Sequence, residues 1–331
     1  MATCWEFSQE LADGNGAAAS LLTARPTGSQ YCAANLVAHK PVNVDTNSAN
    51  SPGGGILFGY INDFSDANAV FDSTATNKFN AARIQIEMGG GLNDELPMFF
   101  SRIFGHTRQS ITAEATAAVV RDVLGFTAPA DGSNLGLIPI ALDLDTWNDM
   151  LAGSADDDWT WNSETGQISS GSDGILEVNL YPQGTGAPGN RGMVDIGSNN
   201  NSTADIARQL TDGVSAADLA HHGGELKLDA NGELFLNGDT GISAGVKDEL
   251  TDIKGLPRTI PIFSDVNGPG NNATFTIVKW AGIRIMEVKL TGPMNNKRVI
   301  IQPAGVVSDG VIPSPETGTS DYVFSRVVLV K

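Results

Sequence analysis

Apolar and polar residues alternate along two stretches of the chain in the way that a half-buried β-strand requires. Residues 79–88 and 110–120 both follow this period of two. A third stretch, residues 56–60, is a short apolar run that comes directly after three glycines. Such runs bounded by glycine are typical of buried strands, so the pattern predicts three strands in the first third of the chain.

Helical spacing marks the other parts of this first third. Residues 1–24 predict a frayed helical lead-in, and residues 29–37 predict a second short helix. Between the predicted strands, Pro97 and Gly105 bracket an apolar segment, as at the start and end of a helix. Its large side chains are spaced for one helical face, so we expect them to pack in the core: Phe99, Phe100, Ile103 and Phe104.

Residues 121–256 mix short strands with capped helices. Strands are predicted over 137–142 and 175–181, and a loop and hairpin over 156–174. Asp145, Ser202 and Ser215 each precede a helical pattern and are expected to cap it, and a further helix is predicted over 243–253. Two apolar runs flank Asn231-Gly232, which predicts a hairpin over 226–236.

The C-terminal part returns to strands, predicted over 273–278, 283–290, 298–303 and 322–330. The sequence therefore predicts an α+β fold, dominated by mixed or antiparallel sheet, with short helices in the middle. We expect a core with its helical lead-in over 1–120, an inserted α+β region over 121–256, and a β region over 257–331 that packs with the first.

Charge and hydropathy then remove several classes of function. The 331 residues carry 20 Lys+Arg and 38 Asp+Glu, a formal charge of −18. Nucleic acids and anionic membranes both select basic surfaces, so neither is an expected partner. No stretch approaches the roughly 18 apolar residues of a membrane helix, and no signal peptide is visible at the N-terminus, so we expect no direct membrane insertion by this chain.

One motif raises the question of a hydrolase. Residues 241–245 match the GxSxG elbow around Ser243. In an α/β-hydrolase the histidine follows the serine, but all four histidines here precede it. Another fold could still bring His221 or His222 to Ser243, with Asp239 as the nearby carboxylate. This esterase or peptidase site stays an alternative, weighed against a serine that simply opens a helix.

Other ligand motifs are weaker. Residues 184–189 match GxGxxG but open no helix on which phosphates could bind, so no cofactor is expected. His221 and His222 point about 100° apart on a helix and would need further ligands to hold a metal. Carboxylates suit Ca²⁺ better, and six of them are candidates for such a site: Asp143, Asp145, Asp149, Asp156, Asp157 and Asp158. None matches an EF-hand loop, so solvated acidic surface is the competing interpretation.

Two further features stay open at this level. Cys4 and Cys32 either form a disulfide or are separate thiols. Trp159 and Trp161 lie on one strand face and either form an exposed binding platform or anchor the hairpin. With the acidic loop, an exposed platform would suit a Ca²⁺- or carbohydrate-binding module.

Three segments together resemble the TadG-like family of Flp/Tad pilus-assembly proteins, in its planctomycete-type form. They are residues 79–84 (FNAARI), 96–105 (LPMFFSRIFG) and 111–119 (ITAEATAAV), within a core of about 25–120. The resemblance implies a membrane helix before this core, which the sequence does not contain, and a place in the cell envelope or outside the cell. It implies protein partners in the pilus machinery and no catalytic residues. The first hypothesis is therefore a non-enzymatic structural or interaction module.

Overall fold

The computed structural model divides the chain into two compact units. Unit 1 comprises Met1–Val120 and Arg326–Lys331, and unit 2 comprises Arg121–Ser325. The expected 257–331 region is thus divided, since its residues up to Ser325 belong to unit 2. The structure describes residues 1–12, 17–64, 66, 68–76, 78–89, 91–180, 191–197, 202–268, 272–293 and 296–330.

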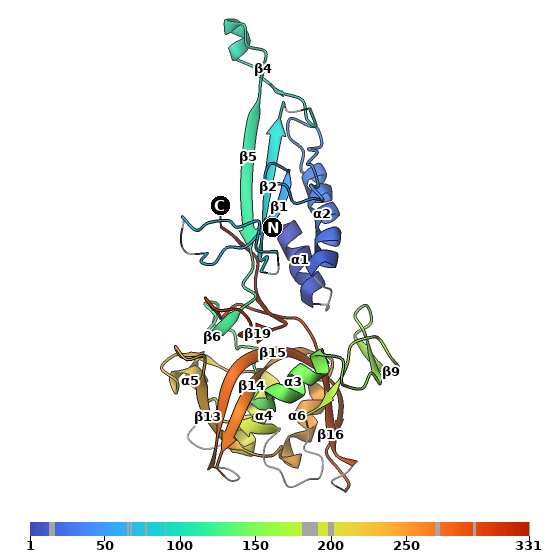
Figure 1. The fold of residues 1–331 in the computed structure, drawn as a ribbon, viewed down its shortest axis with the longest axis vertical. Helices are drawn as coiled ribbons and strands as arrows, with labels where there is room; N and C mark the ends of the chain where they lie inside the picture. The colour runs from blue at the N-terminus through green and yellow to red at the C-terminus, as the bar shows by residue number, and fades with distance from the viewer. Residues whose placement is uncertain are drawn as a thin grey trace. The chain divides into compact units, whose positions relative to one another are not determined.

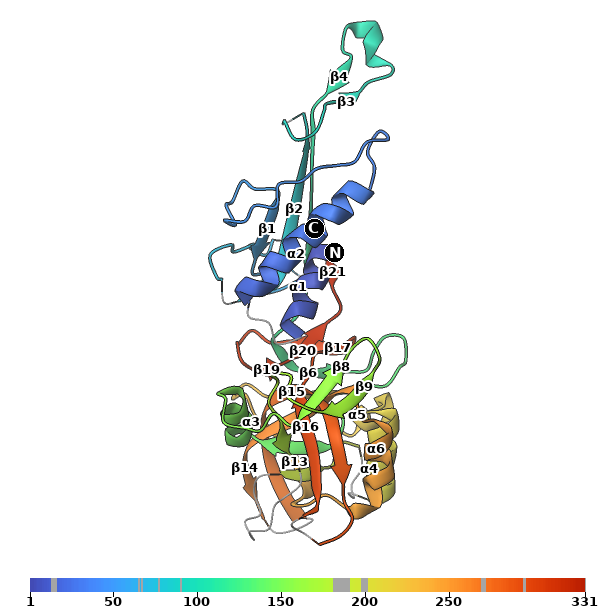
Figure 2. The same ribbon diagram turned by 90° about the vertical axis from the view of Figure 1, so that its right-hand side faces the viewer.

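Unit 1 is a small sheet with two helices across one face (Figures 1 and 2). The helices are α1 (Ala2–Ala12) and α2 (Ala17–Ala34). The sheet is antiparallel, in the order β1-β2-β5-β21. Its strands are β1 (Ile56–Gly59), β2 (Ala81–Met88), β5 (Ile111–Ala118) and β21 (Val328–Leu329).

The core of unit 1 lies between the helices and the sheet. Phe7 of α1 and Phe58 of β1 are fully buried, with ring centroids 5.2 Å apart. Full burial of such a ring stabilises a fold by about 1.5–3 kcal/mol. The strands predicted over 56–60, 79–88 and 110–120 are confirmed. The second helix is longer than predicted, because it begins at Ala17 and continues through Pro26.

The segment predicted as a helix over 97–105 is instead the turn of a hairpin, so that prediction is wrong. β3 (Leu96–Pro97) pairs with β4 (Arg108–Gln109), and a single 3-10 turn, η1 (Ser101–Phe104), lies between them. Met98 N donates to Thr107 O at 2.9 Å, which closes the hairpin around the turn. Helices of one or two turns are marginal unless packing supports them, and here the hairpin pairing prevails.

Unit 2 is built around a closed ring of strands. β14 pairs with both β7 and β15, so the order β15-β13-β11-β7-β14 closes on itself, and β16, β10 and β19 extend the sheet. The bounds are β7 (Ile140–Asp143), β10 (Val178–Asn179), β11 (Arg191–Val194), β13 (Leu234–Asp239), β14 (Pro257–Asn267), β15 (Ala273–Lys289), β16 (Arg298–Pro303) and β19 (Ser320–Asp321).

Helices and smaller sheets surround this ring. Helices α3 (Leu144–Leu151), α4 (Thr203–Asp212) and α5 (Ala216–Ala220) have side-chain caps, and η2 (Ala244–Val246) leads into α6 (Lys247–Asp252). The remaining strands are β6 (Val123–Thr127), β8 (Trp159–Asn162), β9 (Gln167–Ser170), β12 (Glu225–Lys227), β17 (Val306–Ser308), β18 (Val311–Pro313) and β20 (Val323–Ser325). The fold class is confirmed as α+β, rich in mostly antiparallel sheet.

Three details of unit 2 differ from the sequence prediction. Asp143, not Asp145, caps α3, accepting from Thr146 N at 2.9 Å. The turn at Asn231-Gly232 forms, but its flanking strands do not pair, because β12 joins β6 while β13 joins β11 and β15. The strands predicted over 273–278 and 283–290 are one continuous strand, β15.

Small residues let the ring close tightly. Phe275 of β15 is buried against Phe263 of β14, with centroids 5.0 Å apart. A Cβ at Gly192 would lie 2.3 Å from the Phe275 ring, and one at Gly238 would lie 2.9 Å from it. The lack of a side chain at these two glycines therefore leaves space for the Phe275 phenyl ring, which fills this part of the core.

Candidate functional site

The residues of the alternative hydrolase site already have structural roles. Ser243 is exposed and caps η2, where its Oγ accepts from Gly245 N at 3.2 Å. Asp239 ends β13 and is also exposed. Among the bonds of the described residues, none joins Ser243 to Asp239 or to a histidine.

The two adjacent histidines lie at the end of a helix. His221 is the C-cap of α5 and is exposed. His222 is half-buried beside Ile196, and burial lowers its pKa, opposed by a hydrogen bond to the Ile196 backbone and by the charge of Asp195.

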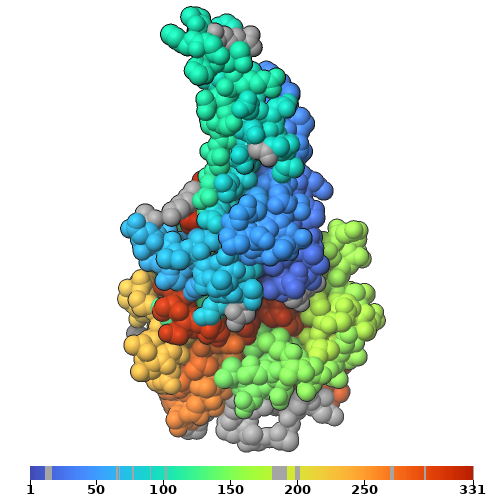
Figure 3. Space-filling view, turned by 45° about the horizontal axis from the view of Figure 1, so that its top comes forward, coloured from blue at the N-terminus to red at the C-terminus, as the bar shows by residue number. Residues whose placement is uncertain are grey.

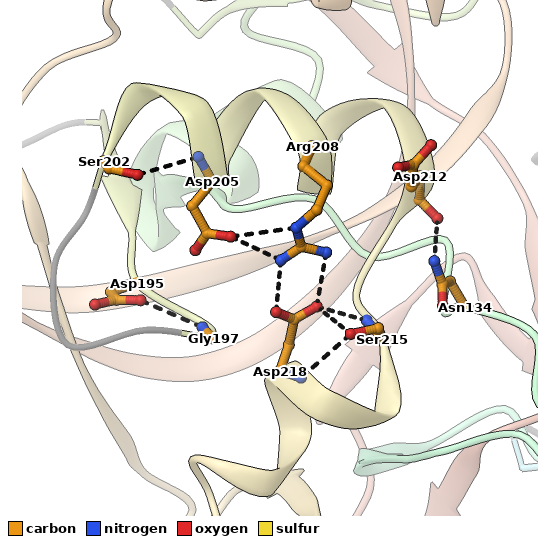
Figure 4. A network of polar contacts seen from close by, with 9 residues as sticks. All are labelled: Asn134, Asp195, Gly197, Ser202, Asp205, Arg208, Asp212, Ser215 and Asp218. Atoms are coloured by element: carbon orange, nitrogen blue, oxygen red, sulfur yellow. Dashed lines mark hydrogen bonds and ion pairs between the residues drawn. The ribbon is translucent and has the colours of Figure 1, made fainter.

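Figure 4 shows the polar network that joins α4 to α5 next to this position. Arg208 donates from both terminal nitrogens to Asp218, at 3.1 and 2.6 Å, and also reaches Asp205 at 2.7 Å. Asp218 in turn accepts from Ser215 N at 2.7 Å and forms a capping box with it. Although burial opposes it, these bonds lower the pKa of Asp218. The network therefore fixes α4 against α5 through charge-assisted hydrogen bonds.

The acidic loop is likewise satisfied by backbone donors. Asp157 accepts from Asp173 N and Gly174 N, both at 3.0 Å, and these bonds lower its pKa. Glu177 is buried and accepts from Asp158 N at 2.8 Å and Trp159 N at 3.2 Å. Burial raises the pKa of Glu177 to about 7. These hydrogen bonds to the Asp157 and Glu177 carboxylates therefore stabilise the β8–β9 hairpin.

No metal centre is found among the described residues, where His, Cys, Asp and Glu form no group of three that could hold an ion. Of the other Ca²⁺ candidates, Asp145 and Asp149 lie in α3, and Asp156 forms a β-bridge with Glu177. The GxGxxG match lies in 181–190, outside the described residues.

The aromatic and sulfur candidates also have places in the packing. Trp161 is half-buried with the Arg284 guanidinium 4.3 Å from its ring centroid, and it packs against Gly255. Cys4 and Cys32 are free thiols. Burial raises the pKa of Cys4 to about 12, which disfavours the reactive thiolate form.

The two edges of the unit 1 sheet differ in whether their outward backbone groups are hydrogen-bonded. At the β1 edge, side chains take the place of a neighbouring strand. Asn50 accepts from Phe58 N at 2.8 Å and donates to Phe58 O at 2.9 Å. Asn47 and Arg25 donate to Ile56 O at 3.0 and 2.8 Å. The backbone groups of this edge are therefore occupied, which prevents another chain from pairing with it.

The β5 edge is open. β21 pairs only with Ala117 and Ala118, and Val330 N donates to Thr116 O at 2.9 Å. Among the described residues, no strand pairs with Ile111–Ala115 on the side away from β2. Gln85 N donates to Gly55 O. The backbone N–H and C=O groups of odd-numbered residues in β2 therefore point toward β1, and those of even-numbered residues point toward β5. It follows that the N–H and C=O groups of Thr112 and Glu114 point away from β2, toward solvent.

An exposed apolar tip lies at the end of the same hairpin. The four side chains expected in the core are 77–83% exposed: Phe99, Phe100, Ile103 and Phe104. The expectation of core packing is therefore wrong. Figure 3 shows this segment standing at the end of the β2–β5 hairpin. We refer to residues 98–104 as the apolar tip.

Comparison with known proteins assigns the first unit. Residues 8–117 match a protein-family model described as "Putative Tad-like Flp pilus-assembly". This segment is a Tad-like domain. The match begins within α1 and covers α2, β1, β2, the apolar tip and nearly all of β5, so the family expected from the motifs is confirmed. No curated protein and no solved structure matches the chain.

The Tad-like match points to a pilus-related role, with partners in that machinery and an association with the envelope or the cell exterior. Within the part of the chain that the structure describes, no helix combines the length and the apolar character needed to span a bilayer. In the sequence, the signal that distinguishes the two sheet edges is the Asn47 and Asn50 pair before β1.

Proposed function

We propose that this protein is a non-enzymatic component of pilus assembly, in the envelope or outside the cell, that binds protein partners through the β5 edge of its Tad-like unit. The open edge at Thr112–Glu114 is the observation that carries the proposal. An extended segment of a partner would add antiparallel or parallel to β5 and continue the sheet beyond β21. Main-chain hydrogen bonds supply affinity in such strand addition, and alternate side chains supply specificity.

The exposed faces of β5 suit this role. Residues Ile111–Ala115 are exposed on both faces of the strand, and most of them are small or β-branched. A partner strand would meet little steric hindrance, while Ile111, half exposed, offers an apolar contact at one end. The charge of −18 supports protein partners over nucleic acid. No cofactor is required for this mode of binding.

Thr112→Pro tests the proposal. Proline at this position removes an N–H that faces solvent, so the ladder to β2 is preserved while strand addition is blocked. In cells that carry this variant we expect loss of surface pili, whereas Thr112→Ala keeps the N–H and should assemble normally. A photo-crosslinking residue placed at Glu114 should label a pilus component in the Thr112→Ala background and not in the Thr112→Pro background.

Two controls keep the interpretation clear. The melting temperature of purified Thr112→Pro should equal that of wild type within about 2 °C, which excludes misfolding. Ser243→Ala should leave pilus output unchanged under this proposal. Normal assembly by Thr112→Pro, or loss of assembly in Ser243→Ala, would argue against the β5 edge and for another activity.

A further inference from the structure

We propose that the apolar tip inserts into the surface of a phospholipid bilayer with anionic headgroups and anchors the Tad-like unit there. The inference goes beyond the proposed function, because strand addition at β5 requires no lipid. Three features of unit 1 carry it: the exposure of the tip in several directions, the basic residues of its hairpin, and its distance from the helices.

The tip exposes apolar side chains in several directions from a single turn. Phe99, Phe100, Ile103 and Phe104 are 77–83% exposed, and the rings of Phe99 and Phe100 lie 5.0 Å apart at 89° to each other. At about 150 Å² for each of the three phenyl rings, the tip presents about 400 Å² of apolar surface, which monomeric proteins seldom expose without a function. A groove on a protein covers one side of such a turn, whereas the apolar phase of a bilayer surrounds all four side chains.

The charge close to the tip favours anionic headgroups. The β3–β4 hairpin contains Arg102 and Arg108 and no acidic residue. Asp94 and Glu95 come just before this hairpin, but Asp94 is paired with Lys40 at 2.5 Å. Basic residues beside an apolar segment are attracted to the negative surface potential of a membrane that contains anionic lipids.

The negative charge of the chain belongs mostly to the other unit. Unit 1 contains 8 Lys+Arg and 11 Asp+Glu, a formal charge of −3, whereas unit 2 contains 12 Lys+Arg and 27 Asp+Glu, a formal charge of −15. The expectation of no direct membrane insertion rests on the total charge and on spanning helices. Charges further than about 10 Å away are largely screened, and insertion of a turn into one leaflet needs no spanning helix.

The tip can enter a bilayer while the helices stay outside it. The Cys4 Sγ lies 3.9 Å from Asn80 O, which places α1 at the Ala81 end of β2. The tip follows the other end, and eight strand residues span about 25 Å. Figures 1 and 2 show the β3–β4 hairpin beyond the ends of both helices. Interfacial insertion needs a depth of only about 5–10 Å, so the tip reaches the lipid without the helices.

Vesicle flotation with the intact chain tests this proposal. The vesicles contain either phosphatidylcholine alone or phosphatidylcholine with about one third phosphatidylglycerol. Wild type should float with both and should bind the anionic vesicles about 10-fold more tightly, because each arginine near the surface adds attraction. Arg102→Gln/Arg108→Gln should remove this preference and keep the weaker binding to phosphatidylcholine alone.

Two matched variants separate the tip from other exposed apolar residues. Phe99→Ser/Phe104→Ser removes two phenyl rings of the tip and should weaken binding to the anionic vesicles at least about 30-fold. Leu22→Ser/Val70→Ser removes two side chains of unit 1 that are 71% and 76% exposed outside the tip, and this variant should bind as wild type does. Because all four side chains are exposed, both variants should keep the melting temperature of wild type.

Equal binding by Phe99→Ser/Phe104→Ser and wild type would overturn the proposal, and so would an equal loss of binding in Leu22→Ser/Val70→Ser. Equal affinity of wild type for the two kinds of vesicle would refute the anionic headgroup. A wild-type chain that floats with neither would also overturn the proposal, even if pilus assembly requires the tip, because the tip would then bind a protein. Thr112→Pro should float like wild type whether or not it assembles pili, so this inference and the proposed function fail separately.

Discussion

Arg25 is the residue whose removal most directly tests how the closed edge of the Tad-like unit is maintained. Its guanidinium is buried and donates to Thr46 O at 2.7 Å, Ile56 O at 2.8 Å and Asn50 Oδ1 at 2.8 Å. It also lies 5.0 Å from the Phe58 ring centroid. Burial lowers the pKa of Arg25, which shows that its desolvation offsets part of this gain.

Arg25→Met should therefore cost less than the sum of these contacts. Hydrogen bonds from a charged donor contribute about 1.5–3 kcal/mol each, but Asn47 still satisfies Ile56 O. Asn50 Oδ1 still accepts from Phe58 N, so Thr46 O alone loses its donor. The lost bond from a charged donor and the lost contact with the Phe58 ring together give an expected loss of about 3 kcal/mol. At about 1.4 kcal/mol for each factor of ten, the amides of β1 should exchange with solvent roughly 100-fold faster.

Hydrogen exchange followed by mass spectrometry, on peptides that cover β1 and β2, measures this change in the intact chain. Arg83→Met is the matched control, since Arg83 also stacks on a phenylalanine, at 4.7 Å from Phe71, but is only partly buried and 3.8 Å from Glu114. Its loss should cost below about 1 kcal/mol, or less than fivefold in exchange. If the β1 amides of Arg25→Met exchange at rates within fivefold of wild type, Arg25 does not stabilise the β1 edge.

Three further predictions concern unit 2. Burial raises the folded pKa of Glu177 from 4.5 to about 7, so its contribution to stability is full below pH 4.5 and is lost as pH rises through 7. Between pH 5 and 8 the melting temperature of Glu177→Gln should therefore fall less than that of wild type. Equal slopes of melting temperature against pH would refute this. Gly192→Ala places a Cβ against the Phe275 ring and should reduce the free energy of unfolding in urea by about 1–3 kcal/mol, and an unchanged midpoint would contradict the packing. EDTA should leave the melting temperature unchanged, since Asp157 and Glu177 accept backbone N–H groups, whereas a fall of several degrees would reveal a bound cation.

Local signals were sufficient for the strands of the Tad-like unit and for the capped helices. The alternation in 79–88 and 110–120 gave β2 and β5, and Ser202 and Ser215 cap helices as their sequence context predicts. These features depend on neighbours within a few residues. Their physical causes, burial on one face and N-cap hydrogen bonds, are therefore contained in short windows of sequence.

The predictions fail where pairing between segments that are distant in the sequence determines the local structure. The 97–105 segment has the ends of a helix, but the pairing of β3 with β4 turns it into an exposed tip. β14 was not predicted, because Pro257 and Pro261 argue against a strand, yet β15 and β7 pair on either side of it. The open β5 edge could not be predicted either, since it depends on where β21 stops, more than 200 residues later.

Amide exchange at Thr112 and Glu114 tests most directly whether β5 receives a partner strand. Both N–H groups face solvent in the free chain and should exchange rapidly. In assembled pilus machinery isolated from cells, the account predicts that both become protected at least 100-fold while neighbouring ladder amides change little. Rapid exchange at both positions within an assembled, functional complex would contradict it.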